Sequence, residues 1–282
     1  MLFEDNIDMH LSIDETSLSN GELYTILTKK SAKGCKGAIV AMVKGTKTEN
    51  VISVLKKISK EKRDLVREVT LDLASSMNKI VSQCFPKAIK VIDRFHVQKL
   101  AFEALQQVRI NHRWDAIDQD NEAKRQARYK TGVYAPFTFI NGDTKKQLLA
   151  RSRFLLFKSP NNWTESQKIR AKILFAQHPD IEKAFSLCHS LRMIFSKNDN
   201  IDIARTKLAK WHNEVDKSNF KTFETVSRTI QLNYNNILNY FRNRSTNASA
   251  ESFNAKLKGF RALLRGVTDI NFFLYRVAKI YA

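Results

Sequence analysis

Residues 66–92 read VREVTLDLASSMNKIVSQCFPKAIKVI and determine the fold class. The two ends of this stretch, residues 66–71 and 88–92, are short apolar runs rich in Val and Ile, which is typical of buried strands. Between them, the segment from the Ser-Ser pair up to Pro86 has apolar residues at helical spacing. A strand, a helix and a second strand in this order form a right-handed crossover between parallel strands. The stretch therefore predicts an α/β protein.

Three further strand-like segments precede this stretch, at residues 10–14, 22–28 and 38–43. A Ser-Asn-Gly turn joins the first two, and an amphipathic helix with Thr48 as its N-cap follows the third. Three meandering strands followed by two right-handed crossovers give a mixed five-stranded sheet. In this sheet the fourth strand lies beside the first and the fifth beside the fourth. The predicted topology is ribonuclease-H-like.

The pattern changes to helical periodicity at residue 97 and keeps it to about residue 244. We interpret residues 97–244 as a large all-helical insertion after the fifth strand. Residues 245–282 contain one helix and then a mostly apolar segment that is expected to pack back on the sheet. The predicted domains are thus a first core part at 1–96, the insertion at 97–244, and a last core part at 245–282.

The composition indicates a globular chain. Of its 282 residues, 43% are hydrophobic, which is enough for a sizeable core, and no apolar run approaches the roughly 20 residues of a membrane span. The N-terminus carries acids where a secretion signal needs a basic start, so we expect a cytoplasmic protein. The three cysteines include no Cys-x-x-Cys pair, which predicts buried free thiols rather than disulfides or a cysteine zinc site.

The charge indicates a polyanionic partner. Lys and Arg number 48 against 28 Asp and Glu, a formal net charge of +20 spread along the whole chain. Cationic side chains that neutralise phosphates release counterions, which favours nucleic acid as the partner. An acidic membrane surface or the ribosome are the alternatives that charge alone leaves open.

Two aspartates fall on predicted neighbouring strands. Asp14 lies late in the first strand and Asp72 ends the fourth. Asp14 taken alone is also typical of a turn cap, and Asp72 of a helix N-cap. Because adjacent strands lie about 4.8 Å apart, the two carboxylates together are placed to share one divalent cation. Asp93 on the next strand is farther from Asp14, so strand geometry favours Asp72.

Further polar residues lie near the same predicted edge. Asp93 and His96 close the fifth strand, and we expect them to support the site without holding metal. Glu251 and Asn254 share one face of a predicted helix with Lys258, although a first-turn Glu also suits the helix dipole without further function. Two arginines continue the basic character of this helix and suit DNA phosphates: Arg261 and Arg265.

Several stretches carry a resemblance to a known family when they are taken in order. They are Ser12-Ile-Asp-Glu15, Thr70-Leu-Asp-Leu73, Phe85-Pro-Lys-Ala88, Ile92-Asp-Arg-Phe-His-Val97, Arg153-Phe-Leu-Leu-Phe-Lys158, Lys210-Trp211, and Thr246-Asn247 through Lys258. Together they resemble the Asp-Asp-Glu transposases of bacterial ISL3-type insertion sequences, over nearly the whole chain. Asp-Arg-Phe-His after Phe-Pro-x-Ala, with Ala-Glu-Ser-Phe-Asn-x-Lys downstream, is the specific set.

The resemblance implies a ribonuclease-H-like catalytic core interrupted by a helical insertion. Its acidic triad falls on Asp14, Asp72 and Glu251, with Asp93 as an alternative second acid. Asp93 and His96 match a Cys/Asp-x-x-His signature of related transposases. The implied activity is DNA cleavage and strand transfer with two Mg²⁺ or Mn²⁺ ions held by the triad.

The resemblance also implies partners. These are the transposon ends and target DNA, and bringing two ends together requires a homodimer or a higher oligomer. Family members carry a zinc-binding and helix-turn-helix region before the first acid, whereas thirteen residues precede Asp14 here. We expect that a separate chain supplies this region, that the copy is truncated, or that the basic insertion binds the ends.

Two other functions use the same features. A ribonuclease-H-like nuclease without strand transfer needs the same three acids, and only a transposase joins DNA. A non-catalytic DNA-binding or accessory protein keeps the charge and the fold but has no turnover. The retained acids argue against the accessory protein.

Overall fold

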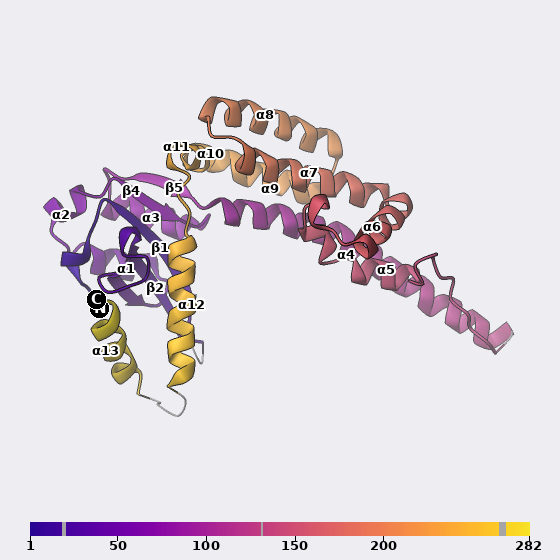
Figure 1. The fold of residues 1–282 in the computed structure, drawn as a ribbon, viewed down its shortest axis with the longest axis horizontal. Coiled ribbons are helices and arrows are strands. Elements are labelled where there is room, and N and C mark those ends of the chain that lie inside the picture. The colour runs from indigo at the N-terminus through magenta and orange to yellow at the C-terminus, as the bar shows by residue number, and fades with distance from the viewer. Residues whose placement is uncertain (19–20, 131, 265–268) are drawn as a thin grey trace. The chain divides into compact units, whose positions relative to one another are not determined.

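The structure is a computed structural model that describes residues 1–18, 21–130, 132–264 and 269–282. The chain divides into two compact units (Figure 1). We call residues 1–97, 199–201 and 233–282 the sheet unit, and residues 98–198 and 202–232 the helical unit. Residues 233–244 thus belong with the sheet, although the sequence assigned them to the insertion.

A five-stranded mixed sheet forms the centre of the sheet unit. Its strands are β1 (His10–Ser17), β2 (Leu23–Lys29), β3 (Ile39–Lys44), β4 (Glu68–Leu71) and β5 (Ile89–Ile92). They lie in the order β3-β2-β1-β4-β5. The meander β1-β2-β3 is antiparallel, whereas β1, β4 and β5 are parallel. This confirms the predicted strand order and the ribonuclease-H-like fold class.

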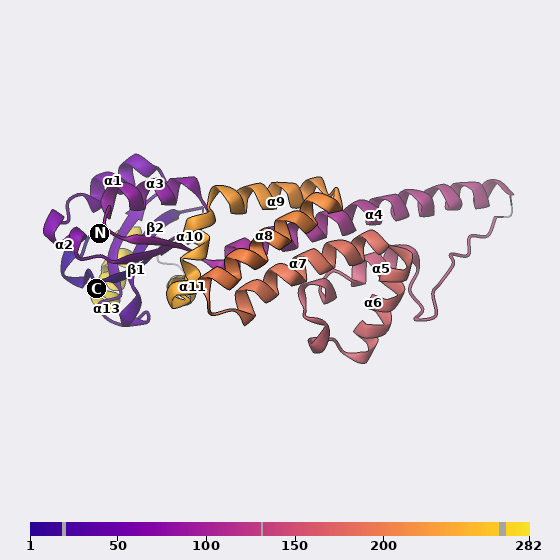
Figure 2. The ribbon, with the colours of Figure 1, turned by 90° about the horizontal axis from the view of Figure 1, so that it is seen from above.

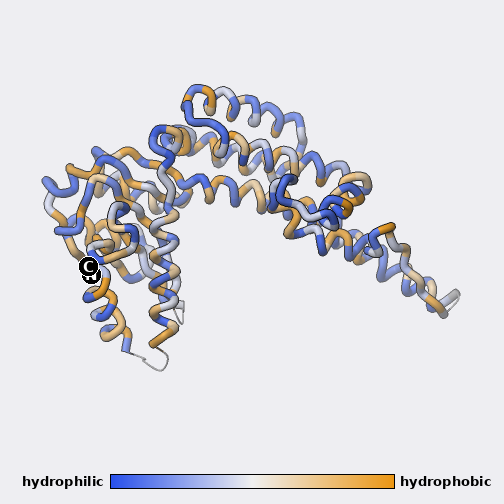
Figure 3. Tube along the Cα trace, in the orientation of Figure 1, coloured by the Kyte–Doolittle hydropathy of each residue, from blue (hydrophilic) through white to orange (hydrophobic). Residues whose placement is uncertain are grey.

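Helices of the sheet unit complete its core. They are α1 (Thr48–Leu55), α2 (Lys60–Asp64), α3 (Ser75–Cys84), α10 (Tyr234–Leu238), α11 (Tyr240–Asn243), α12 (Ala248–Leu263) and α13 (Ile270–Tyr281). Phe253 of α12 and Phe273 of α13 are buried against Tyr24 and Ile26 of β2. Figure 3 shows α13 largely in the apolar colours. As expected, the C-terminal segment packs back on the sheet, where removal of its apolar side chains from water stabilises the fold.

Two local details differ from the sequence prediction. Helix α1 begins at Thr48, but Lys47 takes the N-cap position and no side chain caps the helix. Strand β5 ends at Ile92, and α4 (Arg94–Lys130) begins two residues later, so His96 lies on a helix and not on the strand. The reason is Asp93, whose Oδ1 accepts a hydrogen bond from the N–H of Phe95 at 3.2 Å. A carboxylate there satisfies a first-turn amide, which starts the helix.

The helical unit has no named strand within its described residues. It contains α4 from residue 98 onward, α5 (Lys145–Arg151), α6 (Glu165–Gln177), α7 (Pro179–Lys197), α8 (Ile201–Ser218, of which residue 201 belongs to the sheet unit) and α9 (Lys221–Leu232), with 3-10 turns at Leu155–Phe157 and Pro160–Asn162. Figure 2 shows α7, α8 and α9 extending along the direction of α4. The insertion is therefore all-helical, as predicted.

Two tryptophans anchor the interior of the helical unit. Trp211 is 3% exposed and its Nε1 donates to the carbonyl of Leu187 at 2.9 Å. Trp163 donates from Nε1 to the carbonyl of Leu155 at 2.8 Å, and its ring lies 5.6 Å from that of Phe185. Both indole N–H groups are hydrogen-bonded, and Trp211 is buried in the core whereas Trp163 is half-buried.

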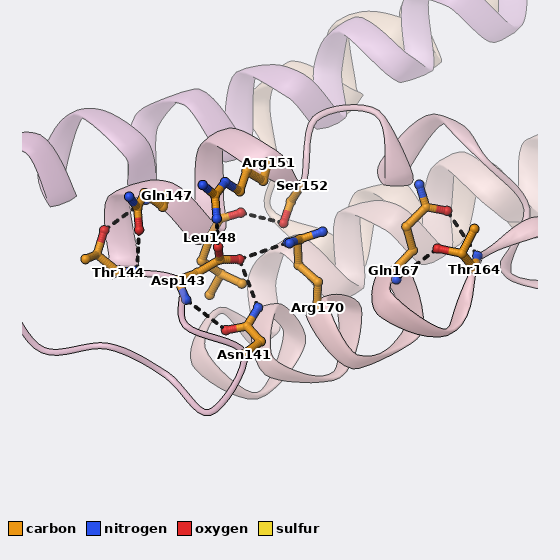
Figure 4. Close-up of polar contacts among 10 residues, drawn as sticks. All are labelled: Asn141, Asp143, Thr144, Gln147, Leu148, Arg151, Ser152, Thr164, Gln167 and Arg170. Carbon is orange, nitrogen blue, oxygen red and sulfur yellow. Dashed lines mark hydrogen bonds and ion pairs between the residues drawn. The ribbon is translucent and has the colours of Figure 1, made fainter.

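A buried aspartate organises the start of α5 and the side of α6 (Figure 4). Asp143 is completely buried and forms ion pairs with Arg151 and with Arg170, the latter at 2.9 Å. Asn141 also donates to it at 2.9 Å. We call these four residues the Asp143 cluster. Burial by itself raises the pKa of Asp143, but the hydrogen bonds from the two arginines outweigh it and hold that pKa below its usual range.

The cysteines are free thiols. Cys84 and Cys188 are buried, as predicted, and burial raises the pKa of the Cys84 thiol to about 11. Cys35 is exposed, so the prediction is wrong there, because it lies in the loop between a 3-10 turn and β3. Within the described residues no helix has the length and apolarity that crossing a membrane requires.

Candidate active site

Three aspartates form one row across the parallel strands. Backbone pairs set the register: Ser12 lies opposite Thr70, and Leu71 lies opposite Ile92. When each register is continued past the last pair, Asp14, Asp72 and Asp93 occupy the same level. Parallel strands in register point equivalent side chains to the same face, and each strand lies about 4.8 Å from the next. The topology therefore gathers three carboxylates at one sheet edge.

Asp14 is held by its own strand and by α12. Its Oδ1 accepts a hydrogen bond from the N–H of Glu15 at 2.8 Å, and its Oδ2 accepts one from Nδ2 of Asn254 at 2.6 Å. Asn254 is 5% exposed, so the amide is fixed by packing. Burial raises the pKa of Asp14 to about 6, and the charges of Asp72 and Glu251 contribute to the same shift. The three predicted acids therefore share one electrostatic neighbourhood.

Asp72 is positioned by an imidazole and an amide. Nε2 of His96 lies 2.9 Å from its Oδ1, and Nδ2 of Asn247 donates to the same oxygen at 3.3 Å. The hydrogen bond to Asp72 raises the pKa of His96. Asn247 is completely buried and also donates to the carbonyl of Ile13 at 3.4 Å. It connects the start of α12 to β1 and to the site.

Sequence reasoning did not assign a role to Asn247. Its position was marked only by the Thr-Asn pair before Ala-Glu-Ser-Phe-Asn. An asparagine directly before a helix is also typical of an ordinary N-cap. In the structure Asn247 does occupy the N-cap position, but its side chain makes no capping bond and turns to Asp72 instead.

Glu251 completes the acidic group from the first turn of α12. Ligand atoms of Asp93, His96 and Glu251 all lie within 4.8 Å of one another. Asp93 is completely buried, and its Oδ2 has no hydrogen-bond partner among the described residues. Burial raises the pKa of Asp93, and the charge of Glu251 raises it further. Of the three predicted metal ligands, only Glu251 belongs to this compact group.

His96 is paired with Asp72, and the nearby Lys30 is engaged elsewhere. The ammonium group of Lys30 is engaged by Glu68 at 3.2 Å and by the hydroxyl of Thr70. His96 is the one imidazole of the compact group. Carboxylates crowded together, with one buried oxygen unpartnered, form a donor set that fits a hard divalent cation such as Mg²⁺ or Mn²⁺. Such a cation offsets the burial and the repulsion from Asp72 that together raise the pKa of Asp14.

The predicted DNA-binding residues differ in their surroundings. Lys258 is exposed on α12, seven residues after Glu251. The guanidinium of Arg261 lies over the ring of Phe273, 5.1 Å from its centroid, so it also contributes to packing. Arg265 lies outside the described residues. Lys258 is therefore the clearest candidate for a phosphate contact.

Comparisons with known proteins identify the family of the chain. A family model of ISL3-type DDE transposases, described as "Transposase", matches residues 11–277. The chain is also similar to the "Transposase for insertion sequence element IS1557" of Mycobacterium tuberculosis, in strain CDC 1551 / Oshkosh and in strain ATCC 25618 / H37Rv. In both cases 29% of 136 residues are identical, covering 48% of this chain. The match spans 30% of the length of those relatives.

Proposed function

Because the chain belongs to the family of ISL3-type DDE transposases, we propose that it contains the metal-dependent DNA cleavage and strand-transfer site of a transposase. The observation that carries the proposal is the row of Asp14, Asp72 and Asp93 with Glu251 beside it. Phosphoryl transfer needs charge relief on the attacking and leaving oxygens, and convergent carboxylates are the protein's means of holding the cations that supply it.

In this proposal Asp14, Asp72 and Glu251 hold two Mg²⁺ or Mn²⁺ ions. When bound, the ions activate the attacking water or 3'-hydroxyl group and neutralise charge on the phosphate. Asn254 keeps the Asp14 carboxylate in place through its 2.6 Å hydrogen bond. His96 and Asn247 fix the Asp72 carboxylate in the same way. Loss of a residue that orients a metal ligand typically lowers metal affinity or activity about 10- to 100-fold.

The substrates follow from the same proposal. The proposed substrates are the DNA of the transposon ends and of the target. The net charge of +20 favours binding to their phosphates. The proposed location is the cytoplasm. Lys258, Arg261 and Arg265 are proposed to contact the DNA backbone beside Glu251. Pairing two ends requires a homodimer or a higher oligomer.

A matched pair of glutamates tests the proposal. Glu251 and Glu49 both lie in the first turn of a helix in the sheet unit, but Glu49 is on the surface, paired with Lys79. We expect Glu251→Gln to lower Mn²⁺-dependent nicking of supercoiled plasmid at least about 10³-fold. Glu49→Gln should nick like the parent protein. Equal nicking by both variants would show that Glu251 only complements the helix dipole.

A joining assay separates transposase from nuclease. The substrate is a labelled duplex with a free 3'-hydroxyl, cut from DNA flanking the protein's own reading frame. A transposase transfers the label into the plasmid, whereas a nuclease only nicks it. Nicking that depends on Glu251 without any transfer of label would show that the protein hydrolyses DNA and does not join it.

A further inference from the structure

A second group of potential metal ligands lies wholly within the helical unit. It consists of His112 on α4 together with His178 and Asp180, which lie at the start of α7. One ligand atom from each residue lies within 4.8 Å of the others. The two imidazole rings are 4.5 Å apart between centroids, and Nε2 of His112 contacts Oδ2 of Asp180. We call these residues the His-His-Asp group.

An ordinary ion pair accounts for only part of this group. Contact between His112 and Asp180 explains two of its members as a link between α4 and α7. It leaves out His178, which is 5% exposed and whose Nε2 has no hydrogen-bond partner among the described residues. A buried polar atom without a partner costs about 1–3 kcal/mol. The packing therefore tolerates an unpartnered nitrogen on an imidazole ring whose centroid is 4.5 Å from that of another imidazole.

The protonation of His178 suits a metal ligand. Burial lowers its pKa to about 4, and the positive charges of His112 and Lys145 add to the effect. The imidazole is therefore neutral at pH 7, and a neutral ring nitrogen is the form that binds metal. On Asp180, Oδ1 accepts the N–H of Ile181 at 3.0 Å, whereas Oδ2 faces His112.

We propose that the His-His-Asp group binds one Zn²⁺ ion. Two imidazoles and one carboxylate are a donor set that zinc accepts, with water as the fourth ligand. Side chains of His112 and Asp180 are 28% and 42% exposed, so an ion and its water reach the site from solvent. The ion links α4 to α7 and satisfies the nitrogen of His178. This site is separate from the carboxylates of the sheet unit, and the proposal does not depend on their function.

Metal titration of the full chain tests the proposal. Co²⁺ serves as a spectroscopic probe, since tetrahedral binding gives visible absorption, and Zn²⁺ content is measured after dialysis. Every protein carries Glu251→Gln, which removes one ligand from the other metal-binding group. We expect one Zn²⁺ per chain, and we expect Asp180→Asn or His112→Asn to weaken binding at least about tenfold, because even outer partners of a ligand contribute that much.

Asp202 provides the matched control. It is the second residue of α8, as Asp180 is of α7, but it pairs with Arg205 on the surface. Asp202→Asn should keep the Co²⁺ spectrum and the Zn²⁺ affinity. Zinc binding by Asp180→Asn and His112→Asn equal to that of the Glu251→Gln parent would overturn the proposal, as would a parent that binds none. His178 is buried, so the substitutions at the part-exposed His112 and Asp180 decide the result even if a His178→Ala variant does not fold.

Discussion

Two groups of acids in this protein are arranged in opposite ways. In the helical unit, Asp143 is completely buried, and two arginines lower its pKa. In the sheet unit, Asp14 faces Asp72, and burial together with that charge raises its pKa to about 6. The first acid has all its partners within the chain, whereas the second lies beside groups of its own charge.

This difference separates an acid with a structural role, Asp143, from the acids of the proposed active site. A buried charge is tolerated when interactions with its partners offset the free energy lost on removal from water. In the Asp143 cluster these partners come from the chain itself. The carboxylates at the sheet edge repel one another, so their arrangement reduces the stability of the chain unless a cation binds. Perturbed groups of this kind concentrate at functional sites. Substitutions in the two places should therefore have opposite effects on stability.

The largest expected effect is on activity and compares neighbours in the acidic row. Asp72→Asn should lower plasmid nicking at least about 10³-fold, because it removes a proposed ligand. Asp93→Asn should lower it only about 10- to 100-fold, as expected for a residue that supports the ligands. Nicking rates at saturating Mn²⁺ measure both. The reverse order would make Asp93 the second acid of the triad.

The next effect is on the stability of the helical unit. Arg170→Met leaves completely buried Asp143 with one arginine, and we expect the free energy of unfolding to fall by about 3 kcal/mol. Urea titration followed by circular dichroism measures the change. Arg205→Met is the control, because its partner Asp202 is exposed and such pairs contribute about 0–1 kcal/mol. Equal losses would mean that burial does not distinguish the two ion pairs.

A smaller effect of opposite sign is expected at Asp14. Its carboxyl group holds a proton more tightly in the folded chain, so the free energy of unfolding falls as pH rises from about 4 to about 6. Asp14→Asn removes this penalty and should stabilise the metal-free protein by about 1–2 kcal/mol at pH 7, with no gain below about pH 4. Mg²⁺ should stabilise the parent more than the variant. Destabilisation at pH 7 would contradict the repulsion.

The smallest effect concerns DNA contact. Lys258→Ala should weaken binding to duplex DNA a few-fold and lower the slope of log K against log[salt] by about one, because one phosphate contact is lost. Lys79→Ala is the control, since Lys79 is exposed in the same unit but paired with Glu49. Fluorescence anisotropy at several salt concentrations measures both. Identical slopes would remove Lys258 from the interface.

Local pattern was sufficient for the elements and their order. Alternating and apolar runs located the five strands, and the handedness of crossovers arranged them as β3-β2-β1-β4-β5. Strand adjacency also predicted that Asp14 and Asp72 lie close together. The start of α4 directly after β5 was not predictable in this way, because Asp93 follows the strand and also accepts the hydrogen bond from the N–H of Phe95 in the first turn of α4. One residue there serves two elements, and periodicity detects neither role.

Sequence by itself thus determined the fold class and the strand order, because these depend on periodicity and chain handedness. Only the tertiary structure decided the contacts between distant residues. It brought Asn254 to Asp14 and Asn247 to Asp72, and it left His178 with an unpartnered nitrogen. These depend on side-chain direction and burial, which arise when helices pack and which no local spacing encodes.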